Sequence, residues 1–305
     1  MTLKEILSTS QLDWEVEKVP LFSQRPELHF DPHSTWFESG YYGIRRKDNM
    51  QILGVCTKQY QETQNEQIVE RAMQIAEAVN GDYTFHKALA LNGGKKIFVQ
   101  LKIENSGGEY DKYIFVVDSN DGSIGLSYGI SNTVLSCANQ LFLFASKGKS
   151  VKHTKSIDIK ADEIALDLQA QLIDIDNKII DLKHTSASDF MIRKIVKTVM
   201  KLPVTIDERL YHDGDIVSKK TKNRVDKLLD CIAKETTEKG DTLWGLLNGV
   251  TYYTNHEIKN MDRDPSGIEK LLFSNANKMN QIAWNCVTKK GGVFDAMENK
   301  YNDGI

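Results

Sequence analysis

Apolar and polar residues follow two different periods along this chain, a period of two in the first half and a period near 3.6 in the second. Within Lys96–Glu104, Val99, Leu101 and Ile103 alternate with polar residues, which predicts a strand with one buried face and one wet face. Apolar and β-branched runs bounded by turn-forming residues predict further strands. These strands are Asp82–Ala90, Tyr113–Val117, Ser123–Ile130, Asn132–Cys137 and Val151–Ile159.

Turn-forming residues and helical spacing predict two hairpins and two helices in the rest of the first half. Tyr41–Lys58 is typical of a hairpin with its turn at Lys47–Asn49, and Leu91–Gly94 is predicted to join two neighbouring strands. Asn65–Val79 is predicted to be an amphipathic helix because its apolar residues recur every three to four positions. Ala138–Lys147 gathers apolar side chains and is predicted to be a short buried helix.

The N-terminal stretch begins with a short amphipathic helix, Leu3–Leu7, followed by a polar segment with scattered aromatic residues. We expect these aromatic side chains to be packed and to hold the segment onto a sheet. They are Trp14, Phe22, Phe30 and Trp36.

The second half is expected to be helical. The predicted helices are Ala161–Leu182, Ser188–Met200, Ser218–Thr237, Asp241–His256 and Gly267–Lys289. Strands followed by helices indicate an α+β fold, with one twisted antiparallel sheet and a flanking helix in the first half and a helical second half. We therefore expect an arm over residues 1–40, a sheet-rich core over 41–160, and a helical region over 161–305 packed on that core.

Composition narrows the class of protein. The 305 residues carry a net charge of −3, so any binding to a polyanion must use a local patch. The four cysteines are not spaced as metal ligands, which favours reduced, mostly buried thiols. The N-terminus does not resemble a signal peptide, and no apolar run approaches the roughly 20 residues of a membrane span. We expect a cytoplasmic protein of a bacterial host cell, without a membrane partner.

Motifs for catalysis are not evident. Asn92–Lys96 resembles a phosphate loop only superficially, because it lies between two strands and lacks the GxxxxGK[ST] spacing. His212–Asp215 and the turn residues Asp118, Asn120 and Asp121 could offer metal ligands, but loop and turn requirements explain them better. We predict no cofactor, no metal and no catalytic residue.

Basic residues are the stronger signal. One group, Arg45, Arg46 and Lys47, is predicted to lie at a hairpin tip. A second group falls between residues 145 and 160 and comprises Lys147, Lys149, Lys152, His153 and Lys155. Two predicted helices are also basic, around Arg193–Lys201 and Lys219–Arg224. Such patches could neutralise phosphates, although each could also be a solvated face in a protein whose acids outnumber its bases.

Asp241–Glu257 is the most distinctive helical segment. A ridge of Trp244, Asn248, Tyr252 and His256 recurs every four residues. Such a ridge could stack on nucleic-acid bases, but packing with hydrogen-bonded polar tips is the favoured interpretation.

Several of these segments, in this order and spacing, resemble the phage/plasmid-like family catalogued as domain of unknown function 932. The resemblance runs from about Trp36 to about Phe273 and is carried by YYGIRRKDNMQILGVCTKQY, the strand pair around Gly94, the Ser119–Gly122 turn and TLWGLLNGVTYYTNH. Cys137–Leu141 departs from the family, because Gln140 stands where Thr is usual. The resemblance implies no catalytic residue.

Two functional hypotheses follow. In the first, the protein is a phage or plasmid nucleic-acid-binding protein that anneals single-stranded DNA in recombination as a homo-oligomer, with the hairpin-tip and 147–155 groups contacting the DNA. This draws on a coarse likeness to the sheet-and-helix core of annealing proteins. In the alternative, it is a mobile-element interaction or inhibitor protein that binds a host protein without catalysis. A weaker third option is a nuclease using a metal held by loop acids.

Overall fold

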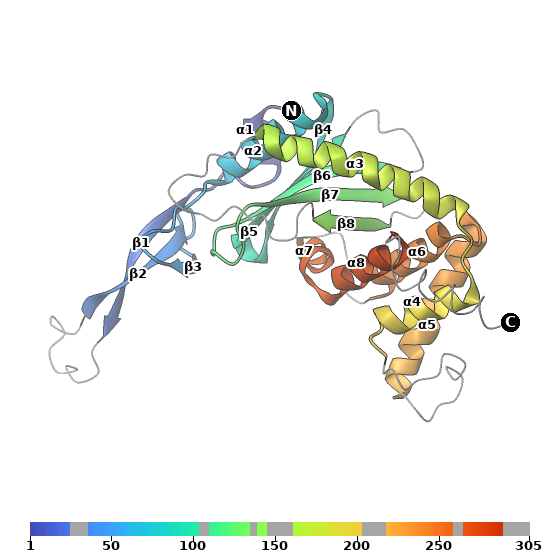
Figure 1. Ribbon diagram of the computed structural model, residues 1–305. Helices are drawn as coiled ribbons and strands as arrows, with labels where there is room; N and C mark the ends of the chain where they lie inside the picture. The colour runs from blue at the N-terminus through green and yellow to red at the C-terminus, as the bar shows by residue number, and fades with distance from the viewer. Residues whose placement is uncertain are drawn as a thin grey trace. The chain divides into compact units, whose positions relative to one another are not determined.

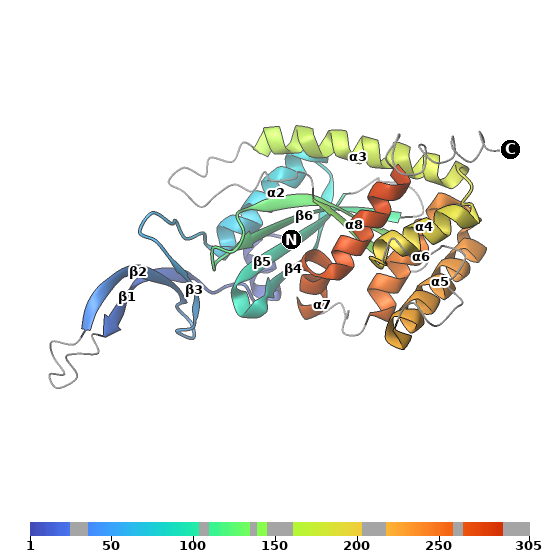
Figure 2. The same ribbon diagram turned by 60° about the horizontal axis from the view of Figure 1, so that its bottom comes forward.

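The computed structural model describes residues 1–24, 36–103, 110–134, 139–144, 161–202, 218–258 and 265–288. The chain divides into two compact units. Unit 1 comprises Met1–Ser131 with Phe144–Ala170, and unit 2 comprises Asn132–Leu143 with Gln171–Ile305. Strands dominate the first half and helices the second, which confirms the predicted α+β class (Figures 1 and 2).

A three-stranded antiparallel sheet lies near the N-terminus. It follows helix α1 (Leu3–Thr9), which begins with a capping box between Thr2 and Glu5. Its strands, in the order β1-β2-β3, are β1 (Val16–Gln24), β2 (Trp36–Arg46) and β3 (Ile52–Cys56). The β2–β3 pair confirms the predicted hairpin.

A five-stranded sheet follows in the order β4-β5-β6-β7-β8. Its strands are β4 (Tyr83–Leu91), β5 (Lys96–Ile103), β6 (Tyr110–Ser119), β7 (Ser127–Val134) and β8 (Gln140–Phe144). β5 pairs antiparallel with both β4 and β6, and the predicted β4–β5 hairpin is confirmed, with a single 3₁₀ turn at Asn92–Gly94.

The strands thus form two sheets, and the expectation of one sheet is wrong. The two sheets come close together at Gly54 of β3, where an added Cβ would lie 2.5 Å from the Cα of Asp121. The backbone of β3 therefore contacts the β6–β7 turn closely without pairing with a strand of the five-stranded sheet.

Helix α2 (Asn65–Asn80) covers β4, β5 and β6, as predicted for a flanking helix. Its apolar stripe, including Ile68 and Ile75, is fully buried together with Phe98 and Phe115 of the sheet. The expected wet face of β5 is wrong at Gln100, which is fully buried. The Gln100 amide is accommodated because it donates a 2.7 Å hydrogen bond to the Ser131 hydroxyl.

The second half contains the expected helices with one difference. They are α3 (Ala161–His184), α4 (Asp189–Val199), α5 (Lys219–Lys239), α6 (Leu243–Tyr252) with a π-helical turn (Tyr253–Glu257), α7 (Pro265–Phe273) and α8 (Asn275–Thr288). The single helix expected over Gly267–Lys289 is broken at Ser274. Here the Asn277 amide donates to the Leu272 carbonyl and the Ser274 hydroxyl accepts from the Ala276 amide, so side chains replace helical backbone bonds. In the described part of the chain, no helix is long and apolar enough to cross a membrane.

Two further expectations need correction. Residues 140–144 form strand β8 instead of a buried helix, because a short apolar run without a clear period suits either element and here it pairs beside β7. Residues 132–134 continue β7 and do not start a new strand. In the N-terminal segment Trp14 is buried, but Phe22 and Trp36 are 53% and 60% exposed. Phe30 and the strand expected over Val151–Ile159 lie outside the described residues.

Candidate nucleic-acid-binding site

The hairpin-tip cations belong to β2 and its turn, and each has a carboxylate partner. Arg45 lies opposite Glu17 in the β1–β2 register, and its Nε and Nη2 donate to Glu17 Oε1 at 3.0 and 2.8 Å. Because the two side chains share one face of the sheet, the pairing follows directly from the strand register.

Arg46 and Lys47 are paired in the same way. Arg46 donates through Nε and Nη2 to both carboxylate oxygens of Asp48, at 2.9 and 2.6 Å, and its guanidinium lies 3.9 Å from the centre of the Trp14 ring. The hydrogen bond from Arg46 lowers the pKa of Asp48. Lys47 Nζ lies 2.5 Å from Glu15, whose hydrogen bond raises the pKa of Lys47.

The hairpin tip is therefore a set of ion pairs, with a matching acid for every cation. The positive electrostatic potential of such a surface is weaker than that of three unpaired cations, so it attracts a polyanion less strongly. That these residues bind nucleic acid stays a prediction. Lys147, Lys149, Lys152, His153 and Lys155 lie outside the described residues.

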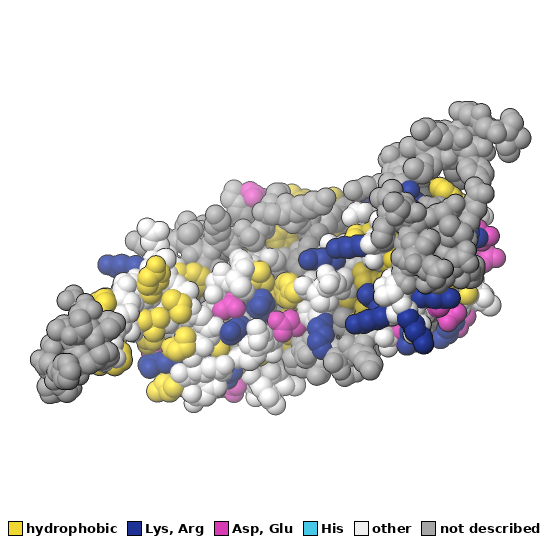
Figure 3. All heavy atoms as spheres, turned by 90° about the horizontal axis from the view of Figure 1, so that it is seen from below, with side chains coloured by type: hydrophobic (Ala, Val, Ile, Leu, Met, Phe, Trp, Pro, Cys, Tyr) yellow, Lys and Arg dark blue, Asp and Glu magenta, His cyan; other side chains and the backbone are white. Residues whose placement is uncertain are grey.

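Two basic segments of unit 2 contain no acidic residue, 193–201 on and just after α4 and 218–224 at the start of α5. Helix α4 packs against α5. Figure 3, which views the molecule from below Figure 1, shows Lys and Arg side chains gathered in the right half of the picture, with some Asp and Glu side chains beside them. We call this the α4–α5 basic surface; its cations are Arg193, Lys194, Lys197, Lys201, Lys219, Lys220, Lys222 and Arg224.

The start of α5 is the unusual part of this surface. Ser218 caps the helix by accepting from the Thr221 amide, but the first turn contains no acid. Lys219, Lys220 and Arg224 are exposed, and the four cations from Lys219 to Arg224 are not ion-paired with any described residue. Cations at a helix N-terminus oppose the helix dipole, so this arrangement is unfavourable for the stability of α5.

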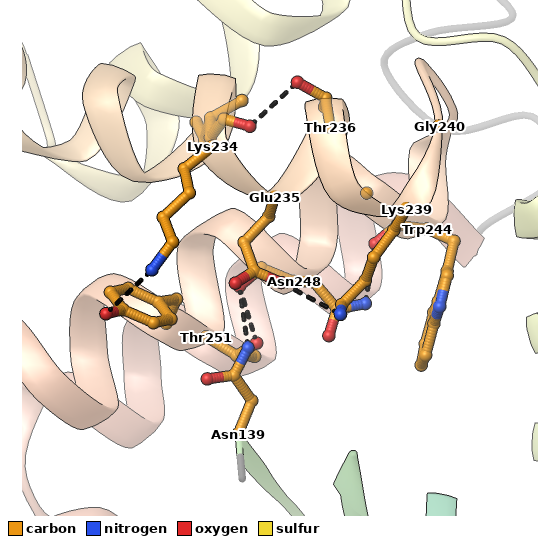
Figure 4. A network of polar contacts seen from close by, with 12 residues as sticks. Asn139, Lys234, Glu235, Thr236, Lys239, Gly240, Trp244, Asn248 and Thr251 are labelled. Atoms are coloured by element: carbon orange, nitrogen blue, oxygen red, sulfur yellow. Dashed lines mark hydrogen bonds and ion pairs between the residues drawn. The ribbon is translucent and has the colours of Figure 1, made fainter. Parts of the chain in front are cut away.

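The Trp244 ridge is mostly internal. Trp244 and Asn248 on α6 are buried, which confirms the packing interpretation for these two residues. The Asn248 amide donates to the Trp244 carbonyl at 2.8 Å, and its own carbonyl accepts from Asn139 and Thr251 (Figure 4). The ring of Tyr252 lies under Lys234 at 4.4 Å. Within this ridge only His256 is exposed.

A buried ion pair lies beside the ridge. Glu235 of α5 is fully buried, and Lys239 Nζ, one turn later, lies 3.4 Å from its Oε2 (Figure 4). Because a charged side chain in a buried position requires a partner, we assign this i,i+4 pair a structural role within α5.

The turn after β6 is a possible cation site by sequence. In the structure its side chains are buried or hydrogen-bonded to the backbone. Asp118, Ser119 and Asn120 are buried. Asp118 accepts from the Ser119 amide at 2.8 Å, and the Asn120 amide donates to the Gly94 carbonyl at 3.0 Å. Tyr60 donates to the Ser119 carbonyl at 2.9 Å, and burial raises the pKa of its hydroxyl. Among the described residues no group of three or more His, Cys, Asp or Glu could hold a metal ion, and His212–Asp215 lies outside them.

Fold and site together define an α+β protein with a basic helical surface at the α4–α5 pair. The chain belongs to the family described as Domain of unknown function (DUF932), whose sequence profile matches residues 52–284. No curated protein and no solved structure matches the chain.

Proposed function

We propose that this protein is a phage or plasmid nucleic-acid-binding protein that holds single-stranded DNA for annealing in recombination, without catalysis. The observation that carries the proposal is the start of α5, where four cations and no acid occupy the first turns of a capped helix. Ordinary surface patterning places acids at this end of a helix, so the reversal calls for a binding role. Phosphate oxygens are a suitable ligand, because exposed amides and cations converge there.

Local concentration of charge is essential to this proposal. With a net charge of −3, the protein as a whole repels a polyanion, and binding must use a surface from which acids are excluded. Residues 193–201 and 218–224 contribute eight cations and no acid to such a surface. The predicted 147–155 group would add to the same function, whereas we assign the ion-paired hairpin tip a smaller part.

Exposed aromatic residues favour single strands over duplex as the ligand. Phe22, Trp36, Phe37 and Tyr41 of the β1–β2 pair are 53%, 60%, 41% and 55% exposed. Phe22 lies opposite Glu38, so Trp36 is its diagonal neighbour on the same face. Bases of a single strand can stack on such rings, whereas those of a duplex are already stacked on each other.

The proposal is tested by the salt dependence of binding to a labelled single-stranded oligonucleotide. Removing all four α5 cations, in K219Q/K220Q/K222Q/R224Q, should weaken binding and reduce the slope of log K against log salt by about 3, from about 0.7 per phosphate contact. The matched control is K178Q/K227Q, because both lysines are already paired, with Asp174 and Glu257 at 2.5 Å. The proposal fails if the control and the α5 variant have the same slope, or if the wild-type protein does not bind.

Annealing is tested separately, by the rate at which two complementary labelled strands pair. The wild-type protein should accelerate pairing and should be a homo-oligomer, because two strands must be held at once. An acceleration that the α5 variant loses supports the full proposal. Binding without acceleration would leave a single-strand-binding protein and refute the annealing role.

A further inference from the structure

A groove on unit 1 has the size of a small-molecule site. Its volume is about 690 Å³, and ligand pockets usually have volumes of about 300–1,000 Å³. Helices α1 and α2 pack against each other, and the groove is lined by residues of these two helices, of β4 and of the first turn of α3 (Figure 1). Every described residue that lines it belongs to unit 1.

The outer surface of α2 forms the longest wall of the groove. Glu70, Gln74 and Glu77 are exposed along this wall, and Met73 and Ala78 are half-buried beside them. Because these positions recur every three or four residues, they form one continuous stripe on the helix. This stripe is distinct from the apolar stripe that α2 buries against the sheet.

Apolar and aromatic groups complete the groove. Leu3 of α1 and the ring of Tyr83 on β4 are half-buried there, together with Met73. Burial and the nearby Glu77 carboxylate raise the pKa of the Tyr83 hydroxyl, which keeps the ring neutral. The face of a neutral aromatic ring attracts an organic cation. The groove therefore favours a ligand that combines apolar segments with positive charge.

Every charged residue that lines the groove is acidic. These residues are Glu70, Glu77 and Asp162, and all three are exposed. None of them forms an ion pair or a side-chain hydrogen bond within the described part of the chain. Their charge is thus available to a ligand, and charge complementarity selects a cation. The described acids do not come together in a group that would hold a metal ion, which favours an organic cation.

The spacing of the acids favours an extended ligand. Glu70 and Glu77 are separated by two helical turns, so their Cα atoms lie about 10.5 Å apart along the helix axis. Two amino groups joined by about nine single bonds, as at the ends of spermidine, are about 11 Å apart in an extended chain. Aliphatic amines are protonated at about pH 7, and the methylene segments between them can pack on apolar side chains.

We infer that this groove binds a linear aliphatic polyamine. Its terminal ammonium groups pair with Glu70 and Glu77, and its methylene segments pack against Leu3 and Met73. Asp162 and the Tyr83 ring add to the attraction for the cation. The inference concerns unit 1 and does not depend on the proposed DNA binding.

The test is isothermal titration calorimetry of the full-length protein with spermidine. Two diamines of equal charge test the length of the ligand, 1,8-diaminooctane and 1,3-diaminopropane. Spermidine should bind with one equivalent per chain. The long diamine should bind at least about tenfold more tightly than the short one, because only the long diamine reaches both glutamates while covering the apolar wall.

Two variants separate the groove from general attraction between charges. E70Q/E77Q should weaken spermidine binding by about tenfold or more. The matched control is E38Q/E66Q, which removes the same charge from two exposed glutamates outside the groove and should leave binding unchanged. A78W fills the groove and keeps all of its carboxylates, so it should also weaken binding.

Several outcomes would overturn the inference. Spermidine could fail to bind, or the two diamines could bind equally. E38Q/E66Q could weaken binding as much as E70Q/E77Q does, which would indicate attraction to the acidic protein as a whole. A folded A78W variant could bind as the wild type does, which would place the ligand elsewhere. Finally, a lysine-rich peptide could bind more tightly than spermidine, which would identify a protein as the occupant.

Discussion

Gly249 tests how closely helices α5 and α6 must approach. A Cβ added at Gly249 would lie 2.4 Å from the Cα and 2.9 Å from the backbone nitrogen of Ile232 on α5. These atoms belong to the backbone of a neighbouring helix, so they cannot move aside as a flexible side chain can. Gly245, one turn earlier, meets the Gly240 carbonyl at 2.5 Å in the same way. The G249A variant should therefore force the two helices apart.

The magnitude follows from two opposing terms. To reach an ordinary contact of 3.4 Å, the added methyl must move about 1 Å from Ile232, which strains the packing by about 3 kcal/mol. Alanine is a better helix former than glycine by about 1 kcal/mol, which offsets part of that strain. The expected net loss is about 2 kcal/mol, or roughly 3 °C in the melting temperature of a 305-residue protein.

Thermal unfolding followed by circular dichroism measures this loss. G43A is the matched control, because a Cβ on Gly43 meets only side-chain ends, Ile52 Cδ1 at 3.0 Å and Leu21 Cδ2 at 3.2 Å, which can turn away. G43A should change the melting temperature by much less than G249A does. If G249A melts at or above the wild-type temperature, the close approach of α5 and α6 is not required and the reasoning is wrong.

Two further predictions concern buried side chains of unit 2. Trp244→Ala should lower the free energy of unfolding by about 3–5 kcal/mol, because the indole is 5% exposed. His256→Ala on the same ridge should cost less, about 1 kcal/mol, because it removes an exposed ring and one hydrogen bond to Asn139. Equal effects in chemical denaturation would contradict the buried ridge. Burial raises the pKa of the Cys231 thiol to about 11, so at pH 8 alkylation by iodoacetamide, read by mass spectrometry, should be slow until the protein is unfolded in urea. Because the folded pKa lies above the ordinary value of 9.0, this thiol stabilises the fold below pH 9 and that contribution is lost as the pH rises towards 11. Fast labelling of the folded protein at pH 8 would contradict the raised pKa.

Elements with a strong period were predictable from the sequence. The 3.6 spacing of Asn65–Val79 corresponds to α2 within one residue, and the turn residues at Leu91–Gly94 correctly joined β4 to β5. Both signals are local, since they depend on residues a few positions apart. The apolar run 141–144 has no such period, and pairing beside β7 decided that it is a strand.

The sequence located the basic residues but did not show which of them form ion pairs with acids. The run Arg45–Lys47 is conspicuous, but two of its acids, Glu15 and Glu17, lie 32 and 28 residues away from their partners and meet them through the β1–β2 register. The four cations at the start of α5 are equally conspicuous and carry no such pairs among the described residues. The sequence alone could not rank these two patches, because ion pairing depends on which strands become neighbours.

The same division holds for the protein as a whole. By itself the sequence determined the α+β class, most helices and strands, the family and the positions of the basic segments. These properties could be predicted because periodicity, turn chemistry and motif order depend on residues that are close together in the chain. Only the tertiary structure decided that the strands form two sheets, that Gln100 is buried, and that α3 leaves Leu166, Ile173 and Ile180 exposed while it buries the opposite stripe. Burial and pairing depend on contacts between segments distant in the chain, and no local pattern specifies which of two apolar faces is covered.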